Sequence, residues 1–403
     1  MKRDVCLAVF YVCFVLLVGC RREPRVELVK PPYDTPLPPG ASALRKITNP
    51  YETPDFSLAC TDLKGLRDGI ENSLNYMSKP SSQQFFPVDD ITHDRAVKSL
   101  EAFAELLGSG LTGAALNQAI RDKFDVYISV GCDDRGTVLF TGYYTPIFEG
   151  SEKPSDQYRY PLYNQPPDLV KGPMGEILGR RAADGTVTQY PPRAVIERTG
   201  MLRGKELIWL TDPFEAYIAH VQGSAKIRLP DGTLQTVGYA GNNGHEYKSV
   251  SQQMISDGVI SKNQLSLGAM IDYFKSHQDQ VVTYTALNPR FVFFMKEEGN
   301  PRGSLNVPVT AYRSVATDKS IFPRASITYI TTTLPQERNG QIVNELYSGF
   351  ALDQDTGGAI RAPGRCDVYM GVGDTAGRLA GQTYQEGKLY YLFIKNELAI
   401  PEY

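Results

Sequence analysis

Short apolar runs separated by glycine, proline and aspartate make up most of the chain after about Val126. Examples are residues 137–144, residues 225–229, which are followed at once by a Pro-Asp-Gly turn, and residues 290–295. Runs of this length between turn residues are typical of β-strands. Many short strands with frequent turns favour barrels over a doubly wound sheet. The bulk of the protein is therefore predicted to be mainly β.

Helical periodicity is restricted to a few segments. Apolar residues repeat every three to four positions in residues 63–77 and 97–107, and Thr92 or Asp94 is placed to cap the second of these helices. A further helical stretch is expected within residues 249–277. These segments predict a few peripheral helices around the β structure.

Composition and charge exclude several classes of function. The 403 residues are 42% hydrophobic with a formal net charge of -3, which is ordinary for a globular protein of two or three domains. Nucleic-acid binding usually requires a basic face, so nucleic acid is not expected as a partner. The histidines lack metal-ligand spacing, and no glycine-rich phosphate loop follows a predicted strand, so neither a metal site nor a cofactor is expected. Three cysteines beyond the N-terminal leader allow at most one disulfide.

The N-terminus has the pattern of an export signal. Two basic residues precede an apolar run, residues 5–18, which is too short to span a bilayer and ends in Leu-Val-Gly-Cys20. This ending resembles a bacterial lipoprotein box, in which Cys20 is lipidated and becomes the first residue of the mature protein. A plain signal peptide with an incidental cysteine is the alternative. Residues 1–19 are therefore predicted to be a lipoprotein signal peptide.

The residues after the leader indicate where the protein is held. Arg21 follows Cys20 in place of an acidic residue, which resembles the sorting pattern of outer-membrane rather than inner-membrane lipoproteins. Residues 20–54 are rich in proline and charge and lack apolar periodicity, which predicts a tether. The expected location is the periplasmic face of the cell outer membrane, through a lipid anchor.

Four aspartates are gathered among glycines near the C-terminus. Asp353, Asp355, Asp367 and Asp374 all lie within residues 352–374. Glycines allow close backbone packing, which can hold the intervening carboxylates on a rigid frame. The same carboxylates can instead satisfy turn and backbone groups, an alternative that stays open for Asp353, Asp355 and Asp374.

Asp367 differs from the others because it lies in a strand-like run, residues 366–370, where a carboxylate is unfavourable unless it faces solvent or a cleft. Side chains alternate across a strand, so if Asp367 and Tyr369 face a groove, Cys366 and Val368 face the core. Cys366 would then be a small buried side chain and not a nucleophile. Residue chemistry thus makes Asp367 the first candidate for a catalytic carboxyl group.

Several motifs follow one another along the second part of the chain. They are Thr141-Gly142-Tyr143-Tyr144-Thr145-Pro146, Tyr160-Pro161-Leu162-Tyr163, Trp209 to Pro213, His220-Val221-Gln222-Gly223-Ser224, Gly238-Tyr239-Ala240-Gly241, Asn288-Pro289-Arg290-Phe291-Val292-Phe293-Phe294, Asp355-Thr356-Gly357-Gly358-Ala359-Ile360 and Asp367-Val368-Tyr369. In this order they resemble the membrane-bound lytic murein transglycosylase A family, over about residues 137–395. The motifs are specific in combination, whereas a single one would be weak evidence.

The resemblance implies a fold and a domain arrangement. Residues 55–146 and 304–403 would form a double-psi β-barrel, whose C-terminal part is the three-aspartate domain of the family. Residues 147–303 would form an inserted second, smaller β-barrel domain, and a sugar strand would lie in the groove between the two.

The resemblance also implies roles for individual residues. Asp367 follows the Asp-x-Gly-Gly-Ala-Ile motif by about a dozen residues, which is the place of the catalytic aspartate in the family, and Asp355 and Asp374 would support it. For some of the tyrosines, packing in the core is the alternative to sugar binding. The candidates for substrate binding are Tyr143, Tyr144, Thr145, Gln222, Ser224, Asn242 and Tyr369.

The implied activity is that of a peptidoglycan lytic transglycosylase. It would cleave the β-1,4 bond between N-acetylmuramic acid and N-acetylglucosamine in peptidoglycan glycan strands and form 1,6-anhydro-muramic ends, with Asp367 as general acid and then as base. Two alternatives stay open: a non-catalytic glycan-binding lipoprotein, and a two-carboxylate peptidoglycan glycoside hydrolase with Asp355 or Asp374 as base. The sequence leaves open whether the protein joins cell-wall enzyme complexes.

Overall fold

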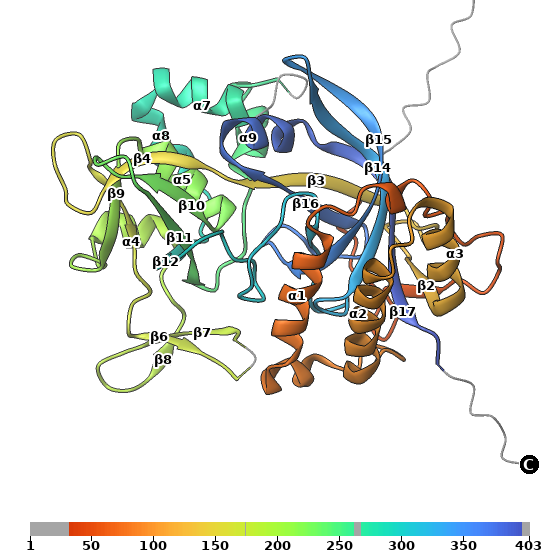
Figure 1. Ribbon diagram of the computed structural model, residues 1–403. Helices are drawn as coiled ribbons and strands as arrows, with labels where there is room; N and C mark the ends of the chain where they lie inside the picture. The colour runs from red at the N-terminus through yellow and green to blue at the C-terminus, as the bar shows by residue number, and fades with distance from the viewer. Residues whose placement is uncertain (1–31, 174, 262–266, 397–403) are drawn as a thin grey trace, which may run out of the picture. The chain divides into compact units, whose positions relative to one another are not determined.

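The computed structural model describes residues 32–173, 175–261 and 267–396 (Figure 1). The predicted signal peptide, Cys20 and the first part of the predicted tether lie outside these residues.

The strands are β1 Leu44–Lys46, β2 Phe124–Ser129, β3 Val138–Thr145, β4 Ile147–Ser151, β5 Tyr160–Tyr163, β6 Leu169–Lys171, β7 Ile177–Arg181, β8 Val187–Thr188, β9 Glu206–Leu210, β10 Ala225–Arg228, β11 Leu234–Asn242, β12 Val292–Glu297, β13 Ser314–Ala316, β14 Ile327–Arg338, β15 Gln341–Asp355, β16 Arg365–Val372 and β17 Tyr384–Ile394. The helices are α1 Leu66–Met77, α2 His93–Gly108, α3 Gly113–Lys123, α4 Arg193–Thr199, α5 Pro213–Gln222, α6 Val250–Ser256, α7 Leu267–Ser276, α8 Gln278–Thr285 and α9 Gly373–Gln382, with 3-10 turns at Ala59–Thr61 and Pro80–Phe85. The prediction of a mainly β protein is confirmed.

The largest sheet closes on itself. Strands β3, β16, β13, β15, β14 and β17 are each paired with the next, and β17 pairs back to β3, which makes a six-stranded barrel. The pairs β3–β16 and β13–β15 are parallel, whereas the other neighbours in the ring are antiparallel. This barrel is compatible with the expected double-psi topology. Strands β1 and β2 extend the sheet beyond β17.

The longest hairpin of the barrel has a clear local cause. Strands β14 and β15 are joined at Arg338 and Gln341, which pair directly across a two-residue turn. The turn residues Asn339 and Gly340 have φ values of 52° and 78°. An Asn-Gly pair with both residues at positive φ is the favoured turn for a hairpin, because its twist matches that of the strands.

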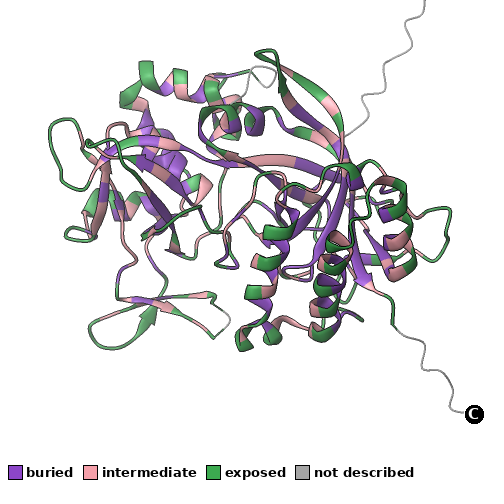
Figure 2. Cartoon of the chain, viewed as in Figure 1, coloured by how far each residue is buried: buried purple, intermediate pink, exposed green. Residues whose placement is uncertain are grey.

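Helices α1, α2 and α3 cover the barrel beside β2, β15 and β17 (Figure 1). Their inward sides are buried and their outward sides are exposed (Figure 2). The helices predicted for residues 63–77 and 97–107 are confirmed as α1 and α2. The predicted cap of α2 is also confirmed, because the Thr92 side chain accepts a hydrogen bond from the backbone N–H of Arg95 at 3.2 Å.

A second sheet, in the order β12-β11-β10-β4-β9-β5, lies in the middle of the chain. A bridge between Asn164 and Phe294 brings the chain after β5 back to β12. Helix α5 contributes buried Phe214, Tyr217 and Ile218 to the core on this sheet. A small separate sheet, β6-β7-β8, projects beyond it (Figure 1).

More helix is present than the apolar spacing predicted. The stretch expected within residues 249–277 contains α6 and α7, but α8 follows directly, and α3, α4, α5 and α9 lie where no helix was predicted. Helix α5 begins at a strong local signal, because Asp212 accepts hydrogen bonds from the backbone N–H groups of Phe214 and Glu215, and Pro213 is the first helical residue. Proline at that position and an aspartate cap stabilise a helix start even where the apolar pattern is not amphipathic.

A buried ion pair lies inside the barrel. The carboxylate of Asp353 is fully buried and contacts Lys319 Nζ, whose side chain is 5% exposed. The same carboxylate accepts hydrogen bonds from Thr317 Oγ1 at 2.8 and 2.9 Å and from Tyr391 Oη at 2.8 Å. Burial lowers the pKa of Lys319, and the charge of Asp353 opposes this effect. Asp353 is therefore part of the barrel's interior and not of a surface site.

Two further findings concern the membrane and the thiols. Within the described residues, no helix is both long and apolar enough to cross a membrane. Cys60, Cys132 and Cys366 are all free thiols.

Candidate active site

Asp367 lies on β16, between β3 and β13 of the barrel. It is opposite Thr141 of β3 in the parallel register and opposite Ala316 of β13 in the antiparallel one. Its neighbours Cys366 and Val368 are fully buried in the barrel core. Asp367 and Tyr369 are on the other face of the strand and line a cavity. The alternation expected from the sequence is therefore observed.

The surroundings of Asp367 favour its protonated form. Burial raises the pKa of this carboxyl group, although the nearby charge of Arg365 and a hydrogen bond from Thr141 Oγ1 act in the opposite direction. Arg365 Nη2 lies 3.8 Å from Asp367 Oδ1, and the Asp367 side chain is 19% exposed. A carboxyl group that is both reachable and inclined to keep its proton has the properties of a general acid.

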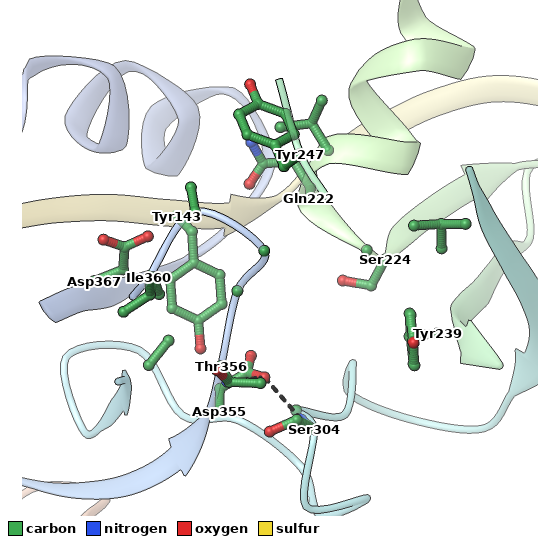
Figure 3. Close-up of a pocket in the computed structure, with 18 of the residues that line it drawn as sticks. Tyr143, Gln222, Ser224, Tyr239, Tyr247, Ser304, Asp355, Thr356, Ile360 and Asp367 are labelled. Atoms are coloured by element: carbon green, nitrogen blue, oxygen red, sulfur yellow. Dashed lines mark hydrogen bonds between the residues drawn. The ribbon is translucent and has the colours of Figure 1, made fainter. Parts of the chain in front are cut away.

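The cavity beside Asp367 has a volume of about 410 Å³ and is lined by residues of both large sheets and their connecting loops. Asp367, Tyr143 and Asp355 lie on one side of it, and Ser224 and Tyr239 lie on the opposite side (Figure 3). A cavity that contains a few polar groups among aromatic and apolar ones is typical of a binding site for an organic ligand.

Asp355 ends β15 and faces the same cavity. Its Oδ1 accepts hydrogen bonds from the backbone N–H groups of Ser304, at 2.7 Å, and Thr356, at 2.8 Å. The Tyr143 hydroxyl points toward it (Figure 3). Burial raises the pKa of Asp355, and the two backbone donors lower it. These donors fix the carboxyl group of Asp355 in place, which suits a supporting residue.

Most of the other sequence-predicted residues meet at this cavity. Thr145 Oγ1 lies 2.9 Å from Tyr369 Oη and 3.4 Å from Ser224 Oγ, so these three hydroxyl groups form a chain. The Gln222 side chain accepts a hydrogen bond from the backbone N–H of Tyr144 at 3.3 Å. Among the described residues, the buried hydroxyl of Tyr143 has no hydrogen-bonding partner within 3.5 Å, although it faces the Asp355 carboxyl group closely enough to lower the pKa of that group.

Three predicted residues lie away from the cavity wall. The ring of Tyr144 packs against Gly377 of α9, because successive residues of β3 face opposite sides and Tyr143 and Thr145 take the cavity side. Asn242 is buried, and its side chain reaches the wall by donating a hydrogen bond to the Tyr239 hydroxyl. Asp374 is exposed in the first turn of α9.

The wall also contains residues that sequence reasoning did not select. They include Tyr239, Tyr247, Arg290, Ser304 and Arg361. Tyr239 and Arg290 lie inside the motifs quoted above, so their place in these motifs could have identified them as candidates for the site. Tyr247, Ser304 and Arg361 reach the cavity from loops, and no spacing in the sequence marks them. Within the described residues, no group of three or more His, Cys, Asp and Glu side chains is arranged to hold a metal ion.

Comparison with known proteins shows the family to which this fold belongs. Residues 139–295 match the MltA specific insert domain, and residues 313–393 match the 3D domain. The membrane-bound lytic murein transglycosylase A of Escherichia coli strain K12 is 30% identical over 272 residues, which cover 66% of this chain and 69% of that protein. The crystal structure of the membrane-bound lytic murein transglycosylase from Agrobacterium tumefaciens shares the fold, with a TM-score of 0.73 and 24% identity over 87% of this chain and 98% of that one. The crystal structure of E. coli MltA with bound chitohexaose has a TM-score of 0.64 and 26% identity over 82% of this chain and 90% of that one. The chain thus belongs to the membrane-bound lytic murein transglycosylase A family of peptidoglycan lytic transglycosylases.

Proposed function

We propose that the protein cleaves the β-1,4 bond between N-acetylmuramic acid and N-acetylglucosamine in peptidoglycan glycan strands and leaves 1,6-anhydro-muramic ends. The observation that supports this most is the position of Asp367, a carboxyl group with a raised pKa in the wall of the cavity. The E. coli relative with bound chitohexaose supports a β-1,4-linked amino-sugar chain as the ligand of this cavity.

In the proposed mechanism, Asp367 acts alone and in two steps. The protonated carboxyl group first donates its proton to the bridging oxygen, the glycosidic bond breaks, and positive charge develops at C1 of the muramic acid. The C6 hydroxyl of the same sugar then attacks C1, and the ionised Asp367 accepts the hydroxyl proton. Because the nucleophile is already attached to the sugar, proximity replaces the positioned water that a hydrolase needs.

The other cavity residues are proposed to bind and orient the strand. The Tyr143 hydroxyl, which faces Asp355 without a close hydrogen bond to it, can bond a sugar acetamido or hydroxyl group, since a buried polar atom gains free energy when it finds a close partner. Thr145, Tyr369 and Ser224 present linked hydroxyl groups, and Gln222 extends the same wall. Tyr144, Asn242, Asp355 and Asp374 are proposed to act indirectly, through packing, through Tyr239 or by holding the barrel.

Mass spectrometry of fragments released from purified murein tests this proposal against its alternatives. We expect fragments lighter by one water than hydrolysis products, because the C6 hydroxyl replaces water as the nucleophile. Fragments with hydrated reducing ends would instead favour a hydrolase with Asp367 as acid and Asp355 or Asp374 as base. Binding of murein without any released fragment would favour a glycan-binding lipoprotein.

The charge of the cavity wall leads to a prediction about the substrate. Arg290 and Arg361 line the cavity, and within the described residues neither lies within 4.0 Å of a carboxylate oxygen. Peptide stems on murein carry carboxylates, which such cations attract. We expect Arg361→Gln to raise KM for murein about fivefold, equivalent to roughly 1 kcal/mol for an exposed charge contact. Steady-state kinetics at low salt measures this change.

The affinity for neutral chitohexaose should be unchanged in Arg361→Gln, and Arg203→Gln, an exposed arginine outside the cavity, should leave both values unchanged. An equal loss of affinity for chitohexaose and for murein would show that Arg361 acts on the sugar or on the fold and not on substrate charge.

We also propose an arrangement for the whole chain. Residues 1–19 are removed as a signal peptide, lipidated Cys20 holds the protein at the periplasmic face of the outer membrane, and residues 20–54 link it to the barrel, on which their last part packs through β1. Residues 55–146 and 304–403 form the catalytic domain, and residues 147–303 form the insert. In support, β4 to β12 all lie within the proposed insert, and the barrel strands lie outside it.

Cys20→Ser is expected to move the protein from the membrane fraction to the soluble periplasmic fraction, because the variant has no thiol for acyl chains and a buried acyl chain contributes roughly 0.8 kcal/mol per methylene. Fractionation followed by immunoblotting measures the distribution. If the variant stayed in the outer-membrane fraction at the wild-type level, the protein would be held there by other contacts.

A further inference from the structure

Arg365 lies between two carboxylates, one of which is Asp367. Its Nη1 donates a hydrogen bond to Asp34 Oδ1 at 3.0 Å. Its Nη2 is 3.8 Å from Asp367 Oδ1 and reaches Thr141 Oγ1 only at 3.5 Å. The guanidinium group is therefore hydrogen-bonded to Asp34, and it touches Asp367 only as a longer ion pair.

The guanidinium group has few other partners. The Arg365 side chain is 14% exposed, and its Nε is buried without a hydrogen-bonding partner among the described residues. Desolvated charges need close partners, so the nearest carboxylates decide where this group lies. Among the described residues, Asp367 is the other carboxylate within 4.0 Å of Arg365, so without Asp34 it is the nearest one.

The segment that carries Asp34 is fixed against the barrel. The Tyr33 hydroxyl donates a hydrogen bond to Glu386 of β17 at 2.5 Å. The Tyr33 carbonyl oxygen lies so close to Gly364 that a Cβ there would approach it to 2.6 Å. The absence of a side chain at Gly364 thus allows this segment to run directly beside the start of β16, and it places Asp34 at Arg365.

An arginine this close to a carboxyl group favours the ionised form, which is the wrong form for a general acid at the start of the reaction. We propose that Asp34 is a positioning residue for the reaction: it holds Arg365 away from direct hydrogen bonding to Asp367 and offsets its charge, so that Asp367 keeps its proton. This inference rests on the proposed function of Asp367. The predicted tether would then contribute a charge to the active site as well as a link to the membrane.

The other groups that face Asp367 do not supply such a charge. From β16 the neighbour on the same face is the Tyr369 hydroxyl, and from β3 it is the Tyr143 hydroxyl; burial raises the pKa of both above its ordinary value, so both are neutral at working pH. Strand β13 presents Ala316 at the opposite register position. Within the described part of the chain, Asp34 and Arg365 are thus the two charged groups that act on Asp367 from nearby.

The pH dependence of kcat/KM on purified murein tests the inference in the full chain. On the alkaline side, activity falls as Asp367 loses its proton. Asp34→Asn is expected to move this fall to lower pH by about 0.5–1 unit, a three- to tenfold loss of activity on the slope, because an uncompensated arginine lowers the pKa of a carboxyl group. Arg365→Gln is expected to move it to higher pH. The double variant should show much less of the Asp34→Asn shift than the single variant, since Asp34 acts mainly through Arg365.

Two further variants separate charge from structure. Asp34→Glu keeps the charge and should restore the wild-type profile even if Asp34→Asn is less stable. Asp62→Asn is the matched control. The Asp62 side chain is 74% exposed, and its Oδ2 lies 3.1 Å from Nη2 of the buried Arg313, so it is also an exposed carboxylate paired with a buried arginine. It should leave the profile unchanged.

Three outcomes would decide against a role for Asp34 or for Asp367, and they are distinguishable. A wild-type profile in Asp34→Asn would overturn the positioning role, provided that Asp367→Asn is inactive. A double variant that keeps the full Asp34→Asn shift would show that Asp34 does not act through Arg365. If Asp367→Asn kept its activity, the proposed function of Asp367 itself would fail.

Discussion

Asp367→Asn is expected to lower kcat for murein cleavage by about 10²–10⁴-fold, the usual contribution of a positioned general acid and base. The amide cannot donate a proton to the bridging oxygen and cannot accept one from the C6 hydroxyl, so both proposed steps are lost. Release of soluble fragments from purified murein measures the rate. The change is nearly isosteric, so the affinity for chitohexaose and the melting temperature should stay close to those of the wild type.

Asp355→Asn is the matched control, because Asp355 lines the same cavity and its carboxyl group also has a raised pKa. Its Oδ1 is occupied by the backbone N–H groups of Ser304 and Thr356, and an asparagine Oδ1 can accept the same two bonds. We expect a smaller loss of rate than for Asp367→Asn, with anhydro ends still formed. Equal, complete losses in both variants would favour the two-carboxylate hydrolase, and a wild-type rate in Asp367→Asn would rule out Asp367 as the acid.

The orientation of Asp367 was predictable because it depends on a local rule. In a strand, alternate side chains face opposite sides, and Cys366 and Val368 are apolar enough to fix which side is the core. The same rule separates Tyr143 from Tyr144, although motif membership alone had grouped them as substrate-binding candidates. Local periodicity was the better guide for neighbouring residues of one strand.

The parts of the site that were not predicted depend on contacts between distant segments. Asp34 and Arg365 are 331 positions apart, and nothing in the spacing of either indicates the other. Ser304 and Arg361 reach the cavity from loops, where no periodicity specifies direction. Helix α5 is a different case. Asp212 and Pro213 indicate the start of a helix, but the apolar residues that follow lack helical spacing, so the helix was not predicted.

Asp353→Asn is expected to lower the free energy of unfolding by about 3–5 kcal/mol at neutral pH, the usual cost of removing one partner of a buried ion pair. Asparagine is similar in shape and can still accept hydrogen bonds from Thr317 and Tyr391, so the loss comes from leaving the Lys319 ammonium group without a countercharge. Urea unfolding followed by circular dichroism measures the change.

The size of this loss should depend on pH. In Asp353→Asn, the folded-state pKa of Lys319 falls further below its unfolded value, because burial already lowers it and the opposing charge is gone. The unfolded state then binds the proton more readily, so the stability of the variant rises with pH and the deficit relative to wild type shrinks as the pH rises from the folded-state pKa of Lys319 toward its unfolded value. The double variant Asp353→Asn/Lys319→Met has no buried cation, and it should be more stable than Asp353→Asn and lack this pH dependence. An Asp353→Asn variant as stable as the wild type at pH 6 would mean that Lys319 finds another partner or water, and that the barrel interior does not depend on this pair.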